Sequence, residues 1–266
     1  MKKQKVTCHL AGYANFKGFE NYSLGNQLFQ VATTLSYAAD NNLQAVFPAF
    51  NDPSKGDYFS GLFKNLNRDG DESFVEDTHQ ESKDFSFFKI PPMKNAKLMG
   101  YFQNERYFKH NRDLILRKIN LSHEDKLYLA EKYPKLQNRK TVSCHLRRGD
   151  YGVLKHVYPS LYEEGYYERA LDFFDEDHTV FVFSDDIDWC KENLKMDNVV
   201  FIHEKDYIDL TAMTMCEHNI IANSSFSWWG AWLNQSKNKR IIAPERWFHD
   251  GHCAGQQIVP KGWIKA

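Results

Sequence analysis

Short apolar runs alternate with helical segments through the second half of the chain, and this alternation limits the folds that the chain can adopt. The runs contain few polar residues, as is typical of strands covered on both faces. They occupy 142–146, 179–183, 199–202, 219–222 and 240–243, and helices are expected between them at 162–174, 187–194, 207–217 and 226–234. Strands that alternate with helices predict a parallel, Rossmann-like α/β sheet.

The first half of the chain carries a weaker α/β pattern. Strands are expected at 6–10, 43–47 and 97–103, and helices at 26–40, 105–119 and 126–133. Residues 51–98 are mostly polar with scattered Phe, and we expect loops and short pieces there. The polar stretch 123–139 is interpreted as a connection. We therefore expect an N-terminal domain at 1–138 and a C-terminal Rossmann-like domain at 139–266.

Polar clusters follow three of the predicted C-terminal strands. They are Arg147-Arg148-Gly149-Asp150, Ser184-Asp185-Asp186 and Asn223-Ser224-Ser225-Phe226-Ser227. Open α/β sheets bind ligands outside the carboxyl ends of their strands. Guanidinium forks suit phosphate, and a hydroxyl-rich turn before a helix offers N–H groups to an anion. Alone, each cluster also fits a surface ion pair or a plain helix cap; together they favour a nucleotide or sugar-nucleotide pocket.

Asp186 and Asp188 fit the D-x-D pattern with which many glycosyltransferases hold a divalent metal. Asp188, however, would lie in the first turn of a helix, where acidic residues favour the helix dipole. Arg147 can neutralise a diphosphate without a metal. We therefore expect no metal site.

Net charge and cysteine content limit the kinds of partner and the cellular compartment that are expected for this protein. Lys plus Arg is 34 and Asp plus Glu is 35, so the net charge of −1 provides no basic field for nucleic acid. The five cysteines are scattered and form no CxxC pair, which favours a reduced, intracellular setting over a disulfide framework or zinc site. The sequence shows no signal-length or membrane-spanning apolar segment. We expect a cytoplasmic protein, with peripheral contact at the inner face of a membrane as an option.

Four ordered motifs resemble glycosyltransferase family 11, the α1,2-fucosyltransferases. They are Leu24–Gln30, Gly100–Gln103, His145–Tyr151 and Ile220–Trp229, and Pro244, Trp247 and Trp263 fit the C-terminal pattern of that family. The resemblance implies a GT-B-like fold of two Rossmann-like domains facing a cleft. It also implies GDP-β-L-fucose as donor, inversion to an α-linkage, and no cofactor or metal.

The resemblance also implies roles for individual residues. Arg147 would bind the donor diphosphate with His145 and Arg148 nearby, although His145 also fits a satisfied buried histidine. Asp185, Asp186 and Asp209 are candidates for the guanosine pocket, and Asn223, Ser224 and Ser225 for phosphate or ribose contacts. Gly25, Asn26 and Gln27, at a loop-to-helix junction, would approach the fucose or the acceptor.

The expected reaction is a single displacement at the anomeric carbon by an acceptor hydroxyl, O2 of a terminal galactose in a glycan. Arg147 and the helix start after Asn223 would stabilise the charge that develops on the departing GDP. Asp150 is a candidate general base, but an ion pair with an Arg fits it equally well; Glu163 and Glu164 are further candidates.

Three alternatives stay open at this point. They are a fucosyltransferase of another linkage, a metal-dependent sugar transferase that uses Asp186 and Asp188, and a non-catalytic sugar-nucleotide or glycan-binding protein. The lead into Gly25 at 12–24 is longer than is usual in the family, and residues 51–98 match no family pattern. Both stretches are expected to border the acceptor, so the sequence leaves the acceptor open, as it does the oligomeric state.

Overall fold

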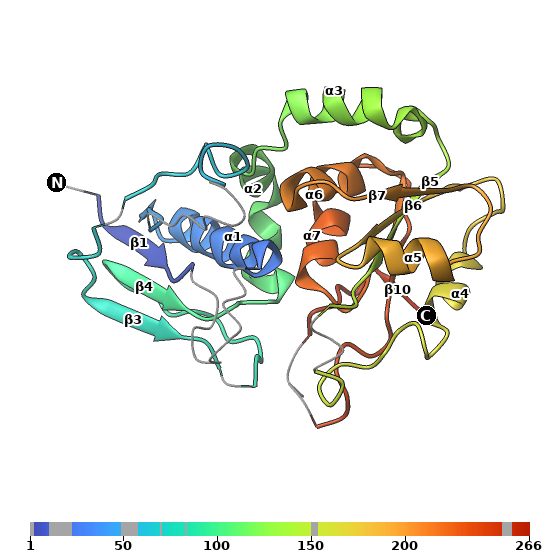
Figure 1. Ribbon diagram of the computed structural model, residues 1–266. Helices are drawn as coiled ribbons and strands as arrows, with labels where there is room; N and C mark the ends of the chain where they lie inside the picture. Colours follow the sequence, from blue (N-terminus) through green and yellow to red (C-terminus); the bar gives the residue numbers. More distant parts are fainter. Residues whose placement is uncertain are drawn as a thin grey trace. The chain divides into compact units, whose positions relative to one another are not determined.

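The computed structural model describes residues 3–10, 23–48, 58–69, 71–82, 84–149, 154–251 and 257–266. The chain divides into two compact units (Figure 1). The first unit comprises residues 1–122 with 253–260, and the second comprises residues 123–252 with 261–266. Both contain a parallel sheet with helices, which confirms the predicted α/β class.

The first unit is built on a four-stranded parallel sheet in the order β2-β1-β4-β3. Its elements are β1 (Lys5–Cys8), α1 (Leu24–Asp40), β2 (Gln44–Ala45), β3 (Asp77–Gln80), β4 (Ala96–Met99), η1 (Glu105–Tyr107), η2 (Lys109–Asn111) and α2 (Arg112–Lys118). Strand β3 lies within the stretch expected to hold loops and short pieces. Its sequence, Asp-Thr-His-Gln, has no apolar run that could mark a strand.

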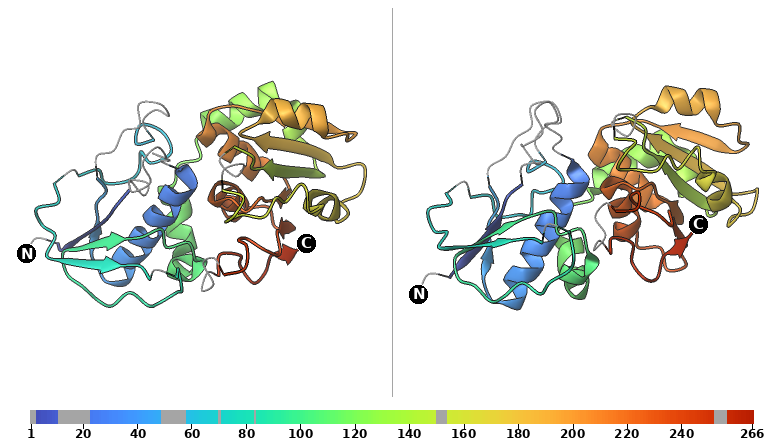
Figure 2. Two further views of the ribbon diagram at one scale, coloured as in Figure 1. Left: turned by 60° about the horizontal axis from the view of Figure 1, so that its bottom comes forward. Right: turned by 90° about the horizontal axis from the view of Figure 1, so that it is seen from below.

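The second unit is built on a six-stranded parallel sheet in the order β10-β9-β8-β5-β6-β7 (Figure 2). Its helices are α3 (His123–Lys132), η3 (Pro134–Gln137), α4 (Tyr166–Leu171), α5 (Ile187–Asn193), α6 (Asp206–Met215) and α7 (Ser225–Leu233). Its strands are β5 (Thr141–Leu146), β6 (Thr179–Ser184), β7 (Val199–Ile202), β8 (His218–Ile220), β9 (Ile241–Ala243) and β10 (Ile264–Lys265).

Apolar side chains leave β6 toward both faces of this sheet. Val180 and Val182 pack in a core cluster with residues of α4 and α5, whereas Phe181 and Phe183 pack in another with residues of α3 and α6. All residues of β5 and β6 are buried, so the prediction of strands covered on both faces is confirmed for this pair.

The polar stretch 123–139 is part of the second unit. Leu129 of α3 and Leu136 of η3 are buried in the same core cluster as Ile208 and Ala212 of α6. The division between the units therefore falls before α3, whereas the sequence suggested a boundary at 138/139. Few residues of α3 are apolar and many are charged, so its sequence does not predict that the helix packs in the core of the second unit.

Strand register sets the edge at which ligands can bind. Leu146 at the end of β5 pairs with Ser184 at the end of β6, so Arg147 and Asp185 leave the sheet together. On the other side of β5, Cys144 pairs with Ile220 of β8, and the chain beyond β8 leads to Asn223. The three polar clusters predicted at strand ends thus share one edge of the second sheet.

Gly230 in α7 allows a close approach to α6, and its replacement by alanine is expected to destabilise the protein. An added Cβ would lie 2.9 Å from Met213 Cβ and 2.8 Å from Met213 Sδ. Alanine gains about 1 kcal/mol of helix propensity over glycine, but overpacking costs about 1–3 kcal/mol. We expect a net loss of about 1 kcal/mol, measured by urea denaturation.

Gly262→Ala is the matched control, because no atom lies within 4 Å of the added Cβ. It should change the free energy of unfolding by no more than about 0.5 kcal/mol. A Gly230→Ala protein as stable as the wild type would show that α6 and α7 can separate without cost.

Candidate functional site

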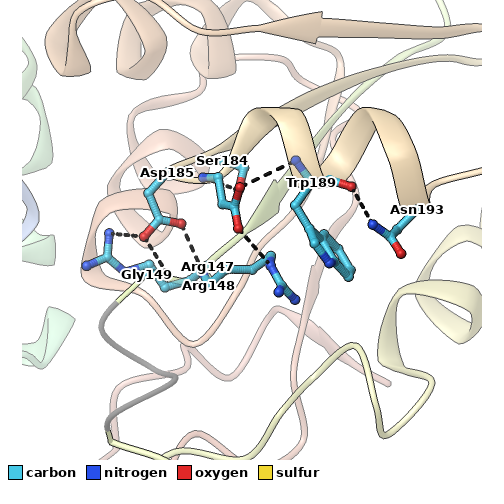
Figure 3. Close-up of polar contacts among 8 residues, drawn as sticks. Arg147, Arg148, Gly149, Ser184, Asp185, Trp189 and Asn193 are labelled. Atoms are coloured by element: carbon cyan, nitrogen blue, oxygen red, sulfur yellow. Dashed lines mark hydrogen bonds and ion pairs between the residues drawn. The ribbon is translucent and has the colours of Figure 1, made fainter.

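The loop after β5 is held by the carboxylate of Asp185. The backbone N–H of Arg148 donates to Asp185 Oδ1 and that of Gly149 to Oδ2, both at 2.9 Å. Arg147 Nη1 lies 3.0 Å from the same Oδ2 (Figure 3). The side chains of this ion pair are 29% and 25% exposed, so the guanidinium is fixed and still open to solvent.

Arg148 is held against the start of α5. Its guanidinium lies 3.4 Å from the ring centroid of Trp189, and its Nε donates to Asp186 Oδ2 at 3.3 Å (Figure 3). Asp186 also caps α5, because its Oδ1 accepts the backbone N–H of Trp189. The stacked ring and the carboxylate together hold the Arg148 side chain in one orientation.

His145, the penultimate residue of β5, is a buried and neutral imidazole. Burial is the main cause that lowers its pKa to about 4; the Asp185 charge opposes this and the Arg147 charge adds to it. Its Nδ1 has no hydrogen-bond partner among the described residues. The ring lies 5.7 Å from that of Phe226 at the start of α7. A buried nitrogen of this kind favours a polar ligand atom as partner.

The strand end after β8 adds the N-terminus of α7. Ser224 is the N-cap residue, yet its side chain makes no capping hydrogen bond, and no acidic side chain lies in the first turn. The positive end of this helix and the hydroxyls of Ser224 and Ser225 therefore suit an anion. Asn223 has a structural contact as well, since its Nδ2 donates to the carbonyls of Pro159 (3.5 Å) and Trp247 (3.3 Å).

Asp209 lies in the first turn of α6, close to the end of β7. It is 8% exposed, and its Oδ1 accepts the backbone N–H of Glu204 at 3.0 Å. Burial raises the pKa of Asp209 to about 8. A buried carboxyl whose pKa is strongly shifted, at the ligand-binding edge of an α/β sheet, is typical of functional sites.

The expected general base lies outside the described residues, which omit Asp150. Glu163 and Glu164 are both exposed, and Glu164 Oε1 is paired with Arg246 Nη2 at 2.8 Å. The D-x-D carboxylates are engaged too: Asp186 caps α5, and Asp188 pairs with Lys191 at 2.8 Å. In the described part of the chain, three potential metal ligands meet only at Asp175, Asp177 and His178, before the amino end of β6.

In the first unit, the beginning of α1 is joined to the turn after β4. Helix α1 begins at Leu24, so Gly25, Asn26 and Gln27 all lie within its first turn. Asn26 Oδ1 accepts a hydrogen bond from Gln103 Nε2 at 2.7 Å. Gln27 is buried, and its Nε2 has no partner among the described residues. Two of the motifs that carried the resemblance thus meet in one polar cluster.

Glu81 and Trp189 are two supporting residues that the sequence did not reveal. Glu81 Oε2 accepts the backbone N–H of Tyr101 at 2.7 Å, and a Cβ at Gly100 would lie 2.4 Å from Glu81 Cβ. Burial raises the pKa of Glu81. The carboxyl therefore holds the turn that presents Gln103. No motif marks Glu81 or Trp189, because their roles depend on contacts between distant segments.

No described helix is long and apolar enough to cross a bilayer.

Comparison with known proteins places this geometry in a family context. The model of glycosyl transferase family 11 matches residues 72–266. The O-antigen biosynthesis glycosyltransferase WbnK of Escherichia coli is 35% identical over 69% of this chain and 66% of its own length. Alpha-1,2-colitosyltransferase of Escherichia coli is 30% identical over 94% of this chain and 87% of its own length. Bovine galactoside alpha-(1,2)-fucosyltransferase 1 is 27% identical over 79% of this chain and 63% of its own length.

Solved structures share the fold. NodZ alpha-1,6-fucosyltransferase soaked with GDP-fucose has a TM-score of 0.58 at 14% identity, over 92% of this chain and 96% of that one. POFUT1 in complex with GDP-fucose has a TM-score of 0.56 at 14% identity, over 91% of this chain and 98% of that one. The predicted GT-B-like fold class is confirmed by these similarities.

Proposed function

The chain belongs to glycosyl transferase family 11, and we propose that it transfers L-fucose from GDP-β-L-fucose to a galactoside with inversion, giving an α1,2-linkage. The observation that carries the proposal is the fixed, solvent-accessible guanidinium of Arg147 at the ligand-binding edge of the second sheet. The α1,2-specific names of two relatives support the linkage.

In the proposed reaction, the acceptor hydroxyl attacks the anomeric carbon while the bond to the β-phosphate of GDP breaks. The leaving diphosphate gains negative charge as the sugar becomes oxocarbenium-like. Arg147 and the N–H groups at the start of α7 supply donors to that charge. Because these groups are already oriented, they stabilise the transition state more than the ground state.

The other expected donor contacts follow from the same edge. His145, two residues before Arg147, offers a buried nitrogen to a polar atom of the donor near its diphosphate. Asp209, in the first turn of α6, offers a buried carboxyl to the guanosine. Asn26 and Gln27 of the first unit are proposed to contact fucose or acceptor. We assign proton removal from the acceptor to Asp150.

The engaged state of Asp186 and Asp188 supports transfer without a divalent metal. Both carboxylates already bind protein groups, and using them for a metal would break a helix cap and an ion pair. Activity that survives excess EDTA is the expected result; loss of activity restored by Mg²⁺ or Mn²⁺ would favour the metal-dependent alternative.

The test of the proposed function is a transfer assay with GDP-L-fucose and a panel of terminal galactosides, followed by linkage determination by NMR. A product with fucose α-linked to O2 of galactose is expected. A product of another linkage would correct the acceptor position. Binding of GDP-L-fucose with no transfer to any galactoside of the panel would reject the proposed acceptor class, and no binding of either substrate would reject the function itself.

A colitosyl donor is a second candidate, because the match to the colitosyltransferase extends over 94% of this chain. Colitose is the 3-deoxy form of L-fucose, so the two donors differ by one hydroxyl. A competition assay with equal GDP-L-fucose and GDP-L-colitose compares their kcat/KM values directly. We expect preference for fucose; exclusive transfer of colitose would reassign the donor.

A further inference from the structure

We infer that Asp185 is a positioning residue, which holds Arg147 and the backbone after it for diphosphate binding, and does not bind guanosine. The inference rests on the proposed function, since it assigns Asp185 to the diphosphate-binding part of the same site. It replaces the guanosine contact that the family resemblance suggested for this carboxylate.

The hydrogen-bonding capacity of the Asp185 carboxylate is largely used within the protein. A carboxylate accepts about four hydrogen bonds. Two are taken by the backbone N–H groups of Arg148 and Gly149, and a third is taken by Arg147 Nη1. All three donors belong to the loop that follows β5. Little capacity is left for a nucleoside.

Gly149 shows how closely the loop and the carboxylate fit. A Cβ at position 149 would lie 2.5 Å from Asp185 Oδ2, less than a van der Waals contact. The absence of a side chain is therefore what allows the backbone N–H to reach the carboxylate. The glycine of this motif serves the approach of Asp185, and not a turn that only glycine could form.

The ion pair orients Arg147 and leaves it able to bind phosphate. The Arg147 side chain is 29% exposed beside the 3.0 Å contact of its Nη1 with Asp185, so the guanidinium stays accessible from solvent. Fixing the side chain before the donor arrives removes most of the entropic cost of ordering it at binding. A preoriented donor also loses less in reorganisation as charge develops on the leaving group.

Asp186 orients Arg148 in the way that Asp185 orients Arg147. Asp186 holds Arg148 through Nε while Trp189 covers the guanidinium face (Figure 3). The two aspartates after β6 thus each bind one arginine after β5. The residues that follow β6 therefore fix the conformation of the residues that follow β5.

The test compares binding of three ligands by wild type and Asp185→Asn. Calorimetric titration uses GDP, pyrophosphate (the anion without the nucleoside) and guanosine (the nucleoside without the anion). We expect Asp185→Asn to weaken the binding of GDP and of pyrophosphate by the same factor, about tenfold or more. The affinity for guanosine should be unchanged. Weaker guanosine binding with unchanged pyrophosphate binding would overturn the inference.

A double-mutant cycle with Arg147→Ala gives a second readout. If Asp185 acts through Arg147, the tenfold effect of Asp185→Asn on pyrophosphate shrinks to less than about threefold once Arg147 is alanine. Undiminished effects in both backgrounds would show an independent role. Asp197→Asn, an exposed carboxylate before β7, is the matched control and should change no affinity.

Gly149→Ala keeps the Asp185 carboxylate and displaces the loop, so it tests the same contact if Asp185→Asn fails to fold. It should weaken pyrophosphate and GDP alike and spare guanosine; unchanged pyrophosphate binding would contradict the inference. Wild-type protein that binds GDP but transfers no sugar would refute the proposed function alone. Wild-type protein that binds neither GDP nor pyrophosphate would refute both.

Discussion

Arg147→Ala is expected to reduce transfer by about 10²–10³-fold in kcat, the usual effect of removing one preorganised donor to a developing charge. The protein should stay folded, because the guanidinium is partly exposed and Asp185 keeps its two backbone N–H partners. The measurement is steady-state kinetics with a saturating acceptor, together with the thermal unfolding midpoint.

Two variants make the result specific. Arg147→Lys retains the charge but not the planar fork, and it should recover only part of the lost rate. Arg139→Ala removes an exposed arginine just before β5, at the opposite edge of the sheet, and should leave kcat unchanged. Near-wild-type transfer by folded Arg147→Ala would refute the site.

Asp209→Asn is expected to stabilise the protein at neutral and alkaline pH. Asp209 has a pKa of about 8 in the folded protein because of burial, against about 3.9 in an unfolded chain. Between pH 4 and pH 8 the unfolded chain releases this proton while the folded protein keeps it. Folding therefore loses stability as pH rises through this range, on the order of 5–6 kcal/mol in total at about 1.4 kcal/mol per pKa unit, and the loss is absent below pH 4.

Asparagine carries no charge and its side-chain oxygen can still accept the N–H of Glu204. The difference in the free energy of unfolding between variant and wild type should therefore grow with pH, from near zero at pH 4 to a few kcal/mol at pH 8. Urea denaturation at pH 5, 6, 7 and 8 measures this difference. A difference that does not vary with pH would contradict a raised pKa at Asp209.

The site edge could be predicted from the sequence because parallel strands place their carboxyl ends together. Arg147, Asp185 and Asn223 each follow an apolar run, and the register of β5 with β6 and β8 confirms that these ends share one edge. Their hydrogen bonds could not be predicted in this way. Whether Asp185 faces a ligand or the neighbouring loop depends on a side-chain direction that periodicity does not determine.

Local backbone geometry limited the prediction of element bounds. The helix expected at 162–174 is α4, which begins only after Gly165, a residue in the left-handed region at φ 67°. The strand expected at 97–103 ends at Met99, because Gly100 and Phe102 take positive φ values of 151° and 53°. Aromatic residues occur on both sides of these limits, so hydrophobic pattern alone cannot mark where regular structure begins or stops.

The contact between Asp185 and the backbone of Arg148 and Gly149 has a consequence for the dynamics of the loop after β5. The amides of Arg148 and Gly149 lie beyond the last paired residue of β5, yet both N–H groups are bound by one carboxylate at the end of β6. A side chain at the end of β6 thereby joins the loop after β5 to the sheet. Opening of this loop then requires two hydrogen bonds and the ion pair to the end of β6 to break, which couples the loop to the β5–β6 pair.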